Sequence, residues 1–111
     1  MKIKNVLIKD LQPTDDLRQE TQRNFFSLSE EKLKQIRPLP QIWRTDNFLM
    51  ISDGNNRVAH YCLRGKKEIL VEYYESAENF HFLLEETIQI AEEFRRRGIF
   101  TPYDLVKNSN Y

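Results

Sequence analysis

Residues 51–60 read ISDGNNRVAH, and this stretch predicts a strand that turns sharply into a helix. Backbone N–H groups at a helix N-terminus lack partners within the helix, and the helix dipole makes that end positive, so it attracts anions. An arginine in the first turn adds a planar group that can bind phosphate or carboxylate through two hydrogen bonds. The stretch therefore predicts a phosphate-binding turn. The residues expected to form it are Gly54, Asn55, Asn56 and Arg57.

Length and composition limit the classes of protein that this chain can represent. Its 111 residues suffice for one domain, and 40% of them are hydrophobic, which is typical of a folded globular protein. Seventeen basic residues balance seventeen acidic ones, so net charge does not support a nucleic-acid partner. Apolar runs are short, and we expect a cytoplasmic protein with no membrane partner. The single cysteine, Cys62, excludes an intrachain disulfide.

The chain before residue 40 predicts one strand and at least one helix. Residues 3–8 alternate loosely between apolar and polar side chains, as strands do. Residues 14–24 are polar and charged, which fits a loop or a short exposed helix. Residues 27–36 predict a helix that begins with a capping box at Ser27, with Ser29 as an alternative cap.

The turn lies between a predicted hairpin and a predicted strand. Residues 41–44 (QIWR) and 48–51 (FLMI) predict two strands joined by a short turn, so we expect them to pair as a hairpin. The helix that opens at the turn should end near Gly65, because glycine favours the left-handed cap conformation. Residues 68–74 then predict a further strand.

A long amphipathic helix is predicted from about residue 80 to residue 97. Glutamates precede three arginines near its end, which complements the helix dipole. This order also allows ion pairs four residues apart, Glu92–Arg96 and Glu93–Arg97. The remaining residues, from 98 to the end, are treated as a tail.

Three residues of the turn carry a resemblance to a known superfamily. Gly54 and Arg57 form a Gly-x-x-Arg turn at a helix start, and the small residue Ala59 follows two positions on. In this setting the pattern is similar to the core of the ParB/sulfiredoxin superfamily. The segment from residue 10 to residue 18 also looks like the one that opens these domains.

The resemblance covers residues 3–75 and implies a fold. That fold is an α+β domain with a small mixed β-sheet packed with three to four helices. The chain is accordingly interpreted as one ParB/sulfiredoxin-like domain over residues 1–111, with the C-terminal helix and tail outside the core.

The resemblance also implies a ligand class. ParB partition proteins bind and hydrolyse CTP, sulfiredoxins use ATP to repair over-oxidised peroxiredoxin, and a related group phosphorylates free serine with ADP. A nucleotide (CTP, ATP or ADP) with Mg²⁺, or another phosphorylated small molecule, is therefore expected at the turn.

Two departures narrow that expectation. Sulfiredoxins place their catalytic cysteine directly after the turn glycine, where this chain has Asn55, so sulfiredoxin chemistry has no nucleophile here. ParB proteins commonly have an acidic residue at that place, and an amide cannot take a proton. ParB proteins also carry a helix-turn-helix domain after this core, and only about 35 residues follow it here.

Several other residues are candidates with alternatives left open. Asp53 could cap the helix, hold a metal-bound phosphate or act as a base, and capping is the preferred interpretation. Glu20 and Glu30 are weaker candidates for a base. Arg18 and His60 are candidates for outer contacts to the phosphate; for His60 a role as a surface residue or as a hydrogen-bonded structural residue is preferred. No set of residues has the spacing of a metal site.

Three functional hypotheses follow. The leading one is a nucleotide- or phosphate-binding domain with the phosphate held at the Gly54–Arg57 turn. The second is a phosphotransferase or nucleotide hydrolase that uses the same turn. The third is a non-catalytic interaction module, such as a homodimer, in which the anion site is vestigial.

Overall fold

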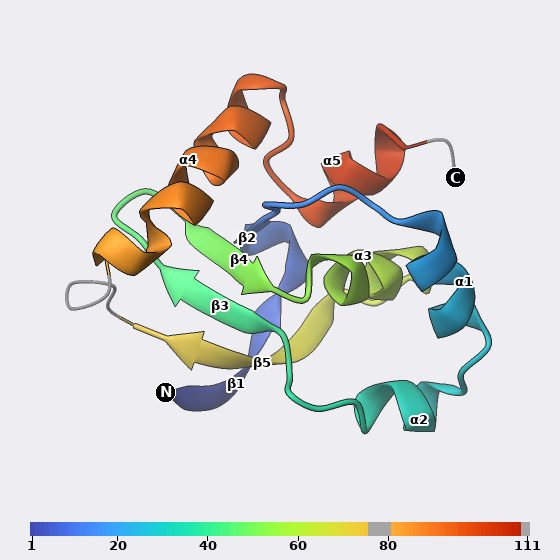
Figure 1. The fold of residues 1–111 in the computed structure, drawn as a ribbon. Coiled ribbons are helices and arrows are strands. Elements are labelled where there is room, and N and C mark those ends of the chain that lie inside the picture. The colour runs from blue at the N-terminus through green and yellow to red at the C-terminus, as the bar shows by residue number, and fades with distance from the viewer. Residues whose placement is uncertain (76–80, 110–111) are drawn as a thin grey trace.

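A computed structural model of the chain describes residues 1–75 and 81–109, and it is built around one mixed sheet. The sheet has five strands in the order β1-β5-β3-β4-β2 (Figure 1). The strands are β1 (Lys2–Leu7), β2 (Leu11–Gln12), β3 (Gln41–Arg44), β4 (Leu49–Asp53) and β5 (Glu68–Tyr74). The helices are the 3-10 helix η1 (Ile8–Asp10), α1 (Gln19–Phe26), α2 (Glu30–Lys34), α3 (Asn55–Leu63), α4 (His81–Arg96) and α5 (Pro102–Lys107). The expected α+β class with a small mixed sheet is confirmed.

The predicted hairpin is present and forms the centre of the sheet. β3 and β4 are antiparallel, with Trp43 opposite Met50, and β3 also pairs in parallel with β5. β1 pairs antiparallel with β5 and forms one edge, whereas the short β2 pairs in parallel with β4 and forms the other. The parallel pair β3–β5 needs a crossover connection, and α3 lies within it.

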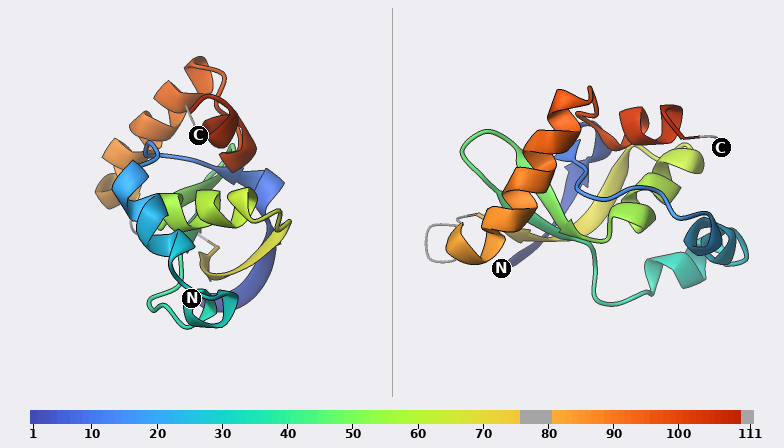
Figure 2. Two further views of the ribbon diagram at one scale, coloured as in Figure 1. Left: turned by 90° about the vertical axis from the view of Figure 1, so that its right-hand side faces the viewer. Right: turned by 45° about the horizontal axis from the view of Figure 1, so that its top comes forward.

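Helix α3 packs both on the sheet and against two other helices. It lies beside α1 and α5 (Figures 1 and 2), and its Val58 and Ala59 are both fully buried. Val58 belongs to the main core, which joins α3 to the sheet. Ala59 belongs to a second cluster with Phe94, Ile99 and Leu105 from the C-terminal part of the chain. The C-terminal residues are therefore part of the packed structure.

The helices before residue 40 differ from the prediction in their boundaries. The capping box at Ser27 is wrong, because Ser27 lies at the C-terminal end of α1 and Ser29 caps α2, accepting from the backbone N–H of Lys32 at 3.2 Å. The expected loop or exposed helix is α1, and it is not fully exposed, since Gln22 is completely buried. Tertiary hydrogen bonds explain that burial, as described below.

The second half of the chain confirms α3, β5 and α4 and adds a helix. The expected start of α4 at Phe80 lies outside the described residues. The predicted pairs of Arg96 and Arg97 four residues apart are wrong: Arg96 pairs with Glu93 at 2.6 Å, and Arg97 approaches Asp16 at 3.7 Å. Helix α5 was not predicted, so the described part of the chain contains five α-helices rather than three or four. In that part, none of the helices is long and apolar enough to cross a membrane.

Candidate functional site

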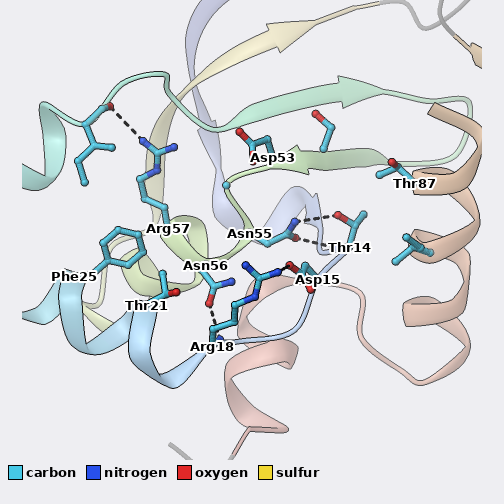
Figure 3. Close-up of a pocket in the computed structure, with 14 residues that line it drawn as sticks. Thr14, Asp15, Arg18, Thr21, Phe25, Asp53, Asn55, Asn56, Arg57 and Thr87 are labelled. Carbon is cyan, nitrogen blue, oxygen red and sulfur yellow. Dashed lines mark hydrogen bonds and ion pairs between the residues drawn. The ribbon is translucent and has the colours of Figure 1, made fainter. Parts of the chain in front are cut away.

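A cavity of about 500 Å³ opens at the N-terminal end of α3. Its walls come from the segment between β2 and α1, from α1 itself, from the β4–α3 turn and from α4 (Figure 3). The turn predicted to bind phosphate therefore lies in a cavity, and Gly54, Asn55, Asn56 and Arg57 all line it. Thr87 and Ile90 bring α4 to the opposite side.

Gly54 allows the chain to change direction at this point. Its φ of +95° lies in the left-handed region, and a Cβ atom there would come within 2.9 Å of Cβ of Pro40. Gly54 is also the N-cap of α3, and it has no side chain with which to cap the helix. The first intrahelical bond runs from N–H of Val58 to the carbonyl of Gly54 at 3.0 Å. The N–H groups of residues 55–57 precede that bond and have no partner within the helix.

Asn55 uses its side chain inside the protein. Its Oδ1 accepts from the backbone N–H of Thr14 at 2.8 Å, and its Nδ2 donates to Oγ1 of Thr14 at 3.0 Å (Figure 3). Oγ1 of Thr14 in turn donates to the carbonyl of Ile51 at 2.6 Å. Asn55 is buried, so this network fixes the segment after β2 against the end of β4.

Asn56 fixes the next part of the same segment. Its Oδ1 accepts from the backbone N–H of Arg18 at 2.8 Å, and its Nδ2 donates to the carbonyl of Asp16 at 3.2 Å. The buried side chain of Gln22 donates to the backbone carbonyl of Asn56 at 2.7 Å. The two amides therefore hold residues 14–22 beside the cavity, and it is the backbone N–H groups of the turn that are left for a ligand.

Two arginines supply the positive charge of the cavity. Arg57 is half-buried and donates from Nη1 to the carbonyl of Ile36 at 3.3 Å, rather than pairing with Asp53 (Figure 3). Burial lowers the pKa of Arg57, while the nearby charge of Asp53 opposes that effect. A guanidinium nevertheless stays charged at neutral pH. Arg18 also lines the cavity and pairs with Asp15 at 2.7 Å.

Asp53 lies at the end of β4 and lines the cavity instead of capping α3. The preferred interpretation of Asp53 as the helix cap is therefore wrong, because the cap position belongs to Gly54. The carboxylate lies on the cavity wall between Arg57 and the α4 side (Figure 3). It is a group that could receive a proton or bind a cation that accompanies a phosphate.

The other acidic candidates lie elsewhere. Glu30 pairs with Lys66 at 3.1 Å, and Glu20 is exposed on the first turn of α1. Neither belongs to the described lining of the cavity. Glu20 and Glu30 therefore lie away from the turn, and of the three candidate bases Asp53 is the one that lines the cavity.

His60 has a hydrogen-bonded structural role, and the alternative of a surface position is wrong. It is fully buried between α1 and α3, where Arg64 donates from Nε to His60 Nε2 at 2.7 Å. Because Nε2 is the acceptor, Nδ1 carries the proton and donates to Oε1 of Gln22 at 2.9 Å. Burial and then the charge of Arg64 lower the pKa of His60 to about 4. Its ring lies among Phe25 and Phe26, so any effect on a ligand would pass through Gln22 and Asn56.

Sequence reasoning did not identify the residues that close the cavity. Thr14, Thr21, Phe25, Thr87 and Ile90 line it from elements distant in the chain. Nothing in their spacing marks them, because only the packing of α1 and α4 around the start of α3 brings them together. In the described part of the chain, no three histidine, cysteine or acidic side chains gather in a way that could hold a metal ion.

Neither a protein-family model nor a curated protein matches this chain. The resemblance to the ParB/sulfiredoxin superfamily thus stays a prediction from the turn and its surroundings.

Proposed function

We propose that this chain is a nucleotide- or phosphate-binding domain, with the phosphate bound at the N-terminus of α3. The observation that carries the proposal is the start of α3, capped by a glycine without a side chain, at the floor of a cavity of about 500 Å³. A cavity of this size falls within the range of small-molecule sites. Backbone N–H groups and the helix dipole favour an anion at this position.

The charges around the cavity support a ligand that brings its own cation or donors. Arg18 and Arg57 can bind phosphate oxygens, whereas Asp53 and Asp15, the ion-pair partner of Arg18, also line the cavity and repel a bare polyphosphate. A nucleotide with Mg²⁺, or a phosphorylated molecule with hydroxyl or amino groups, satisfies both signs of charge. Phe25 and Ile36 add an apolar part to the lining that suits a base or another flat group. The Gly-x-x-Arg resemblance to the ParB/sulfiredoxin superfamily supports the same ligand class.

Isothermal titration calorimetry with CTP, ATP, ADP and inorganic phosphate, each with and without Mg²⁺, tests the proposal. Arg57→Gln should weaken binding roughly tenfold or more, because a charge-assisted hydrogen bond to phosphate is lost. Arg44→Gln is the matched control, since Arg44 is an exposed arginine at the end of β3 and away from the cavity. Absence of binding to all four ligands would reject the proposal, as would equal binding by the wild type and Arg57→Gln. Absence of binding would favour the interaction-module hypothesis, whereas equal binding would mean that the ligand binds away from Arg57.

A phosphotransferase or nucleotide hydrolase is a second candidate, and the position of Asp53 favours it. Among the three carboxylates considered as bases, Asp53 is the one that lines the cavity beside Arg57. Turnover should depend on Mg²⁺ and should fall in Asp53→Asn while phosphate binding is kept. Asp46→Asn, in the exposed hairpin turn, is the control. Binding without any turnover would leave the binding-domain function alone.

A further inference from the structure

A second cavity, of about 370 Å³, lies on the other side of the residue pair Ile36–Arg57. It is enclosed by α2, by the connection from α2 to β3, by α3 and by the neighbouring strands β1 and β5. Arg57 and Ile36 line both cavities, so the hydrogen bond between them is part of a common wall.

The apolar part of this second cavity is well formed. Leu33, Leu39 and Ile69 are buried and contribute to its lining. Leu70 also lines it, although 40% of Leu70 is exposed. A hydrocarbon group placed here would itself leave water against Leu33, Leu39 and Ile69 and would cover the exposed part of Leu70, and burial of apolar surface favours binding.

The charged part of the lining is predominantly positive. Lys34, Arg37 and Arg57 are cations, and Glu68 is the carboxylate on the same lining, which leaves an excess of two positive charges. The carboxylates of Asp53 and Glu72 also act on Arg57 and make the surroundings of its guanidinium less positive. A ligand with one negative charge is thus matched better than a polyphosphate, and the apolar wall gives inorganic phosphate nothing to contact.

We propose that this second cavity binds a small amphipathic carboxylate, with the hydrocarbon against Leu33, Leu39 and Ile69 and the carboxylate among Lys34, Arg37 and Arg57. The proposal does not depend on phosphate binding in the first cavity. Where both sites are occupied, the two anions share one guanidinium. This coupling rests on the proposed function. Because the two anions compete for one guanidinium, each should weaken the binding of the other, and by the same factor, since coupling between two sites is reciprocal.

Octanoate is the probe, with octylamine as a probe of the same chain length but opposite charge and acetate as one without the chain. Calorimetry on the full chain should detect octanoate binding and little or no binding of the other two. Lys34→Glu should weaken octanoate binding roughly fivefold through charge reversal. Lys32→Glu is the matched control, because Lys32 is exposed on the same helix but does not line the cavity.

The apolar wall has its own matched pair of variants. Leu70→Asn should weaken octanoate binding roughly fivefold, whereas Leu7→Asn should leave it unchanged. Leu7 is 39% exposed on the neighbouring strand β1 and does not belong to the described lining. These exposed positions should tolerate asparagine, and circular dichroism of each variant verifies that it folds.

Several outcomes would overturn the proposal. The first is that octanoate does not bind, and the second is that octylamine binds as tightly as octanoate. The third is that each variant and its control lose the same amount of octanoate affinity. A dimer in sedimentation velocity that dissociates in Leu70→Asn, without octanoate binding, would assign this face to a second copy of the chain. Phosphate titrations with and without octanoate then test the coupling, which Arg57→Gln should abolish. A protein that binds octanoate but no phosphate ligand would reject the proposed function alone.

Discussion

At the scale of single residues, the turn depends on two conditions that meet at Gly54. The backbone there is left-handed, and Pro40 occupies the space that a Cβ atom would need. Gly65 shares the first condition with φ of +76°, but nothing lies within 4 Å of its added Cβ. Substitution of Gly65 therefore measures the cost of the left-handed backbone alone, whereas substitution of Gly54 adds the cost of the contact with Pro40.

We expect Gly54→Ala to lower the free energy of unfolding by about 2–4 kcal/mol, the sum of a left-handed alanine and a clash with Pro40. Gly65→Ala should cost only about 1–2 kcal/mol. Urea denaturation of both variants measures the difference. Equal losses would show that the contact with Pro40 contributes nothing.

Asn55 gives a second prediction at this scale. Asn55→Asp keeps the acceptor for the N–H of Thr14 but removes the donor to Oγ1 of Thr14, and it places a charge in a buried site. We expect a loss of about 2–3 kcal/mol in unfolding free energy at pH 7. Asn47→Asp, in the exposed hairpin turn, should change stability little. If both variants unfold at the same urea concentration, the Asn55–Thr14 network is not stabilising.

The residue types of the turn could be read from the sequence, but their partners could not. Gly54 and Arg57 were identified because a left-handed glycine and a first-turn arginine leave a local pattern. The roles of Asn55 and Asn56 depend on residues about forty positions away, Thr14 and Arg18. Amides that bind a phosphate and amides that bind a distant backbone look the same in a sequence, since both need the same donors and acceptors.

At the scale of elements, α1 and α3 are joined by the buried pair His60–Gln22. The folded protein holds His60 neutral with a pKa of about 4, below its ordinary value of 6.5. Between these two values the unfolded chain takes up a proton that the folded chain does not, so the stabilisation is complete above pH 6.5 and is lost as the pH falls toward 4. The loss amounts to about 3 kcal/mol at most.

Urea denaturation at pH 7 and at pH 4.5 measures this dependence. We expect the stability of the wild type to fall more steeply with acid than that of His60→Gln, which has no proton to take up. Carboxylates titrate in both proteins and cancel in the comparison. The same slope in wild type and variant would contradict a neutral, buried His60.

The elements that the sequence did not predict are those without a periodic pattern. β2 contains two residues and exists because it pairs with β4, a long-range contact. The start of α5 does carry a local signal, since Thr101 caps it, Pro102 opens it and Asp104 completes a capping box. We interpreted that proline as part of a tail. A proline in the first turn of a helix is as favourable as one after its end, so the residue alone does not distinguish the two.

At the scale of the whole molecule, the C-terminal part closes the second core. Gln12 is buried and donates to the carbonyls of Pro13 and Ile99, and its Oε1 accepts from Arg95. Ala59 packs against side chains from residues 94–105. These contacts join β2 and α3 to α4 and α5, although the resemblance on which the fold was predicted covers only residues 3–75.

We therefore expect a chain truncated after residue 75 to lose cooperative unfolding. Gln12 and Ala59 would be uncovered, and buried polar groups would lose their partners. Amide dispersion in NMR spectra and a urea titration followed by circular dichroism measure this. The full-length variant Phe94→Ala lies between the wild type and the truncated chain, and its free energy of unfolding should be lower by about 3–5 kcal/mol. A well-dispersed, cooperatively unfolding fragment would show instead that the sheet and α3 form an independent unit.

The order of the strands also determines when the sheet can form during synthesis. Lys2 lies opposite Tyr73, so within the described residues the first strand to be made pairs with β5 alone, more than sixty residues later. Until β5 is complete, β1 is an unpaired strand with Ile3 and Leu7 available to other chains. Pairing across such a separation slows folding relative to helical proteins of similar size. The nascent chain is consequently most prone to aggregation before α3 and β5 have been synthesised.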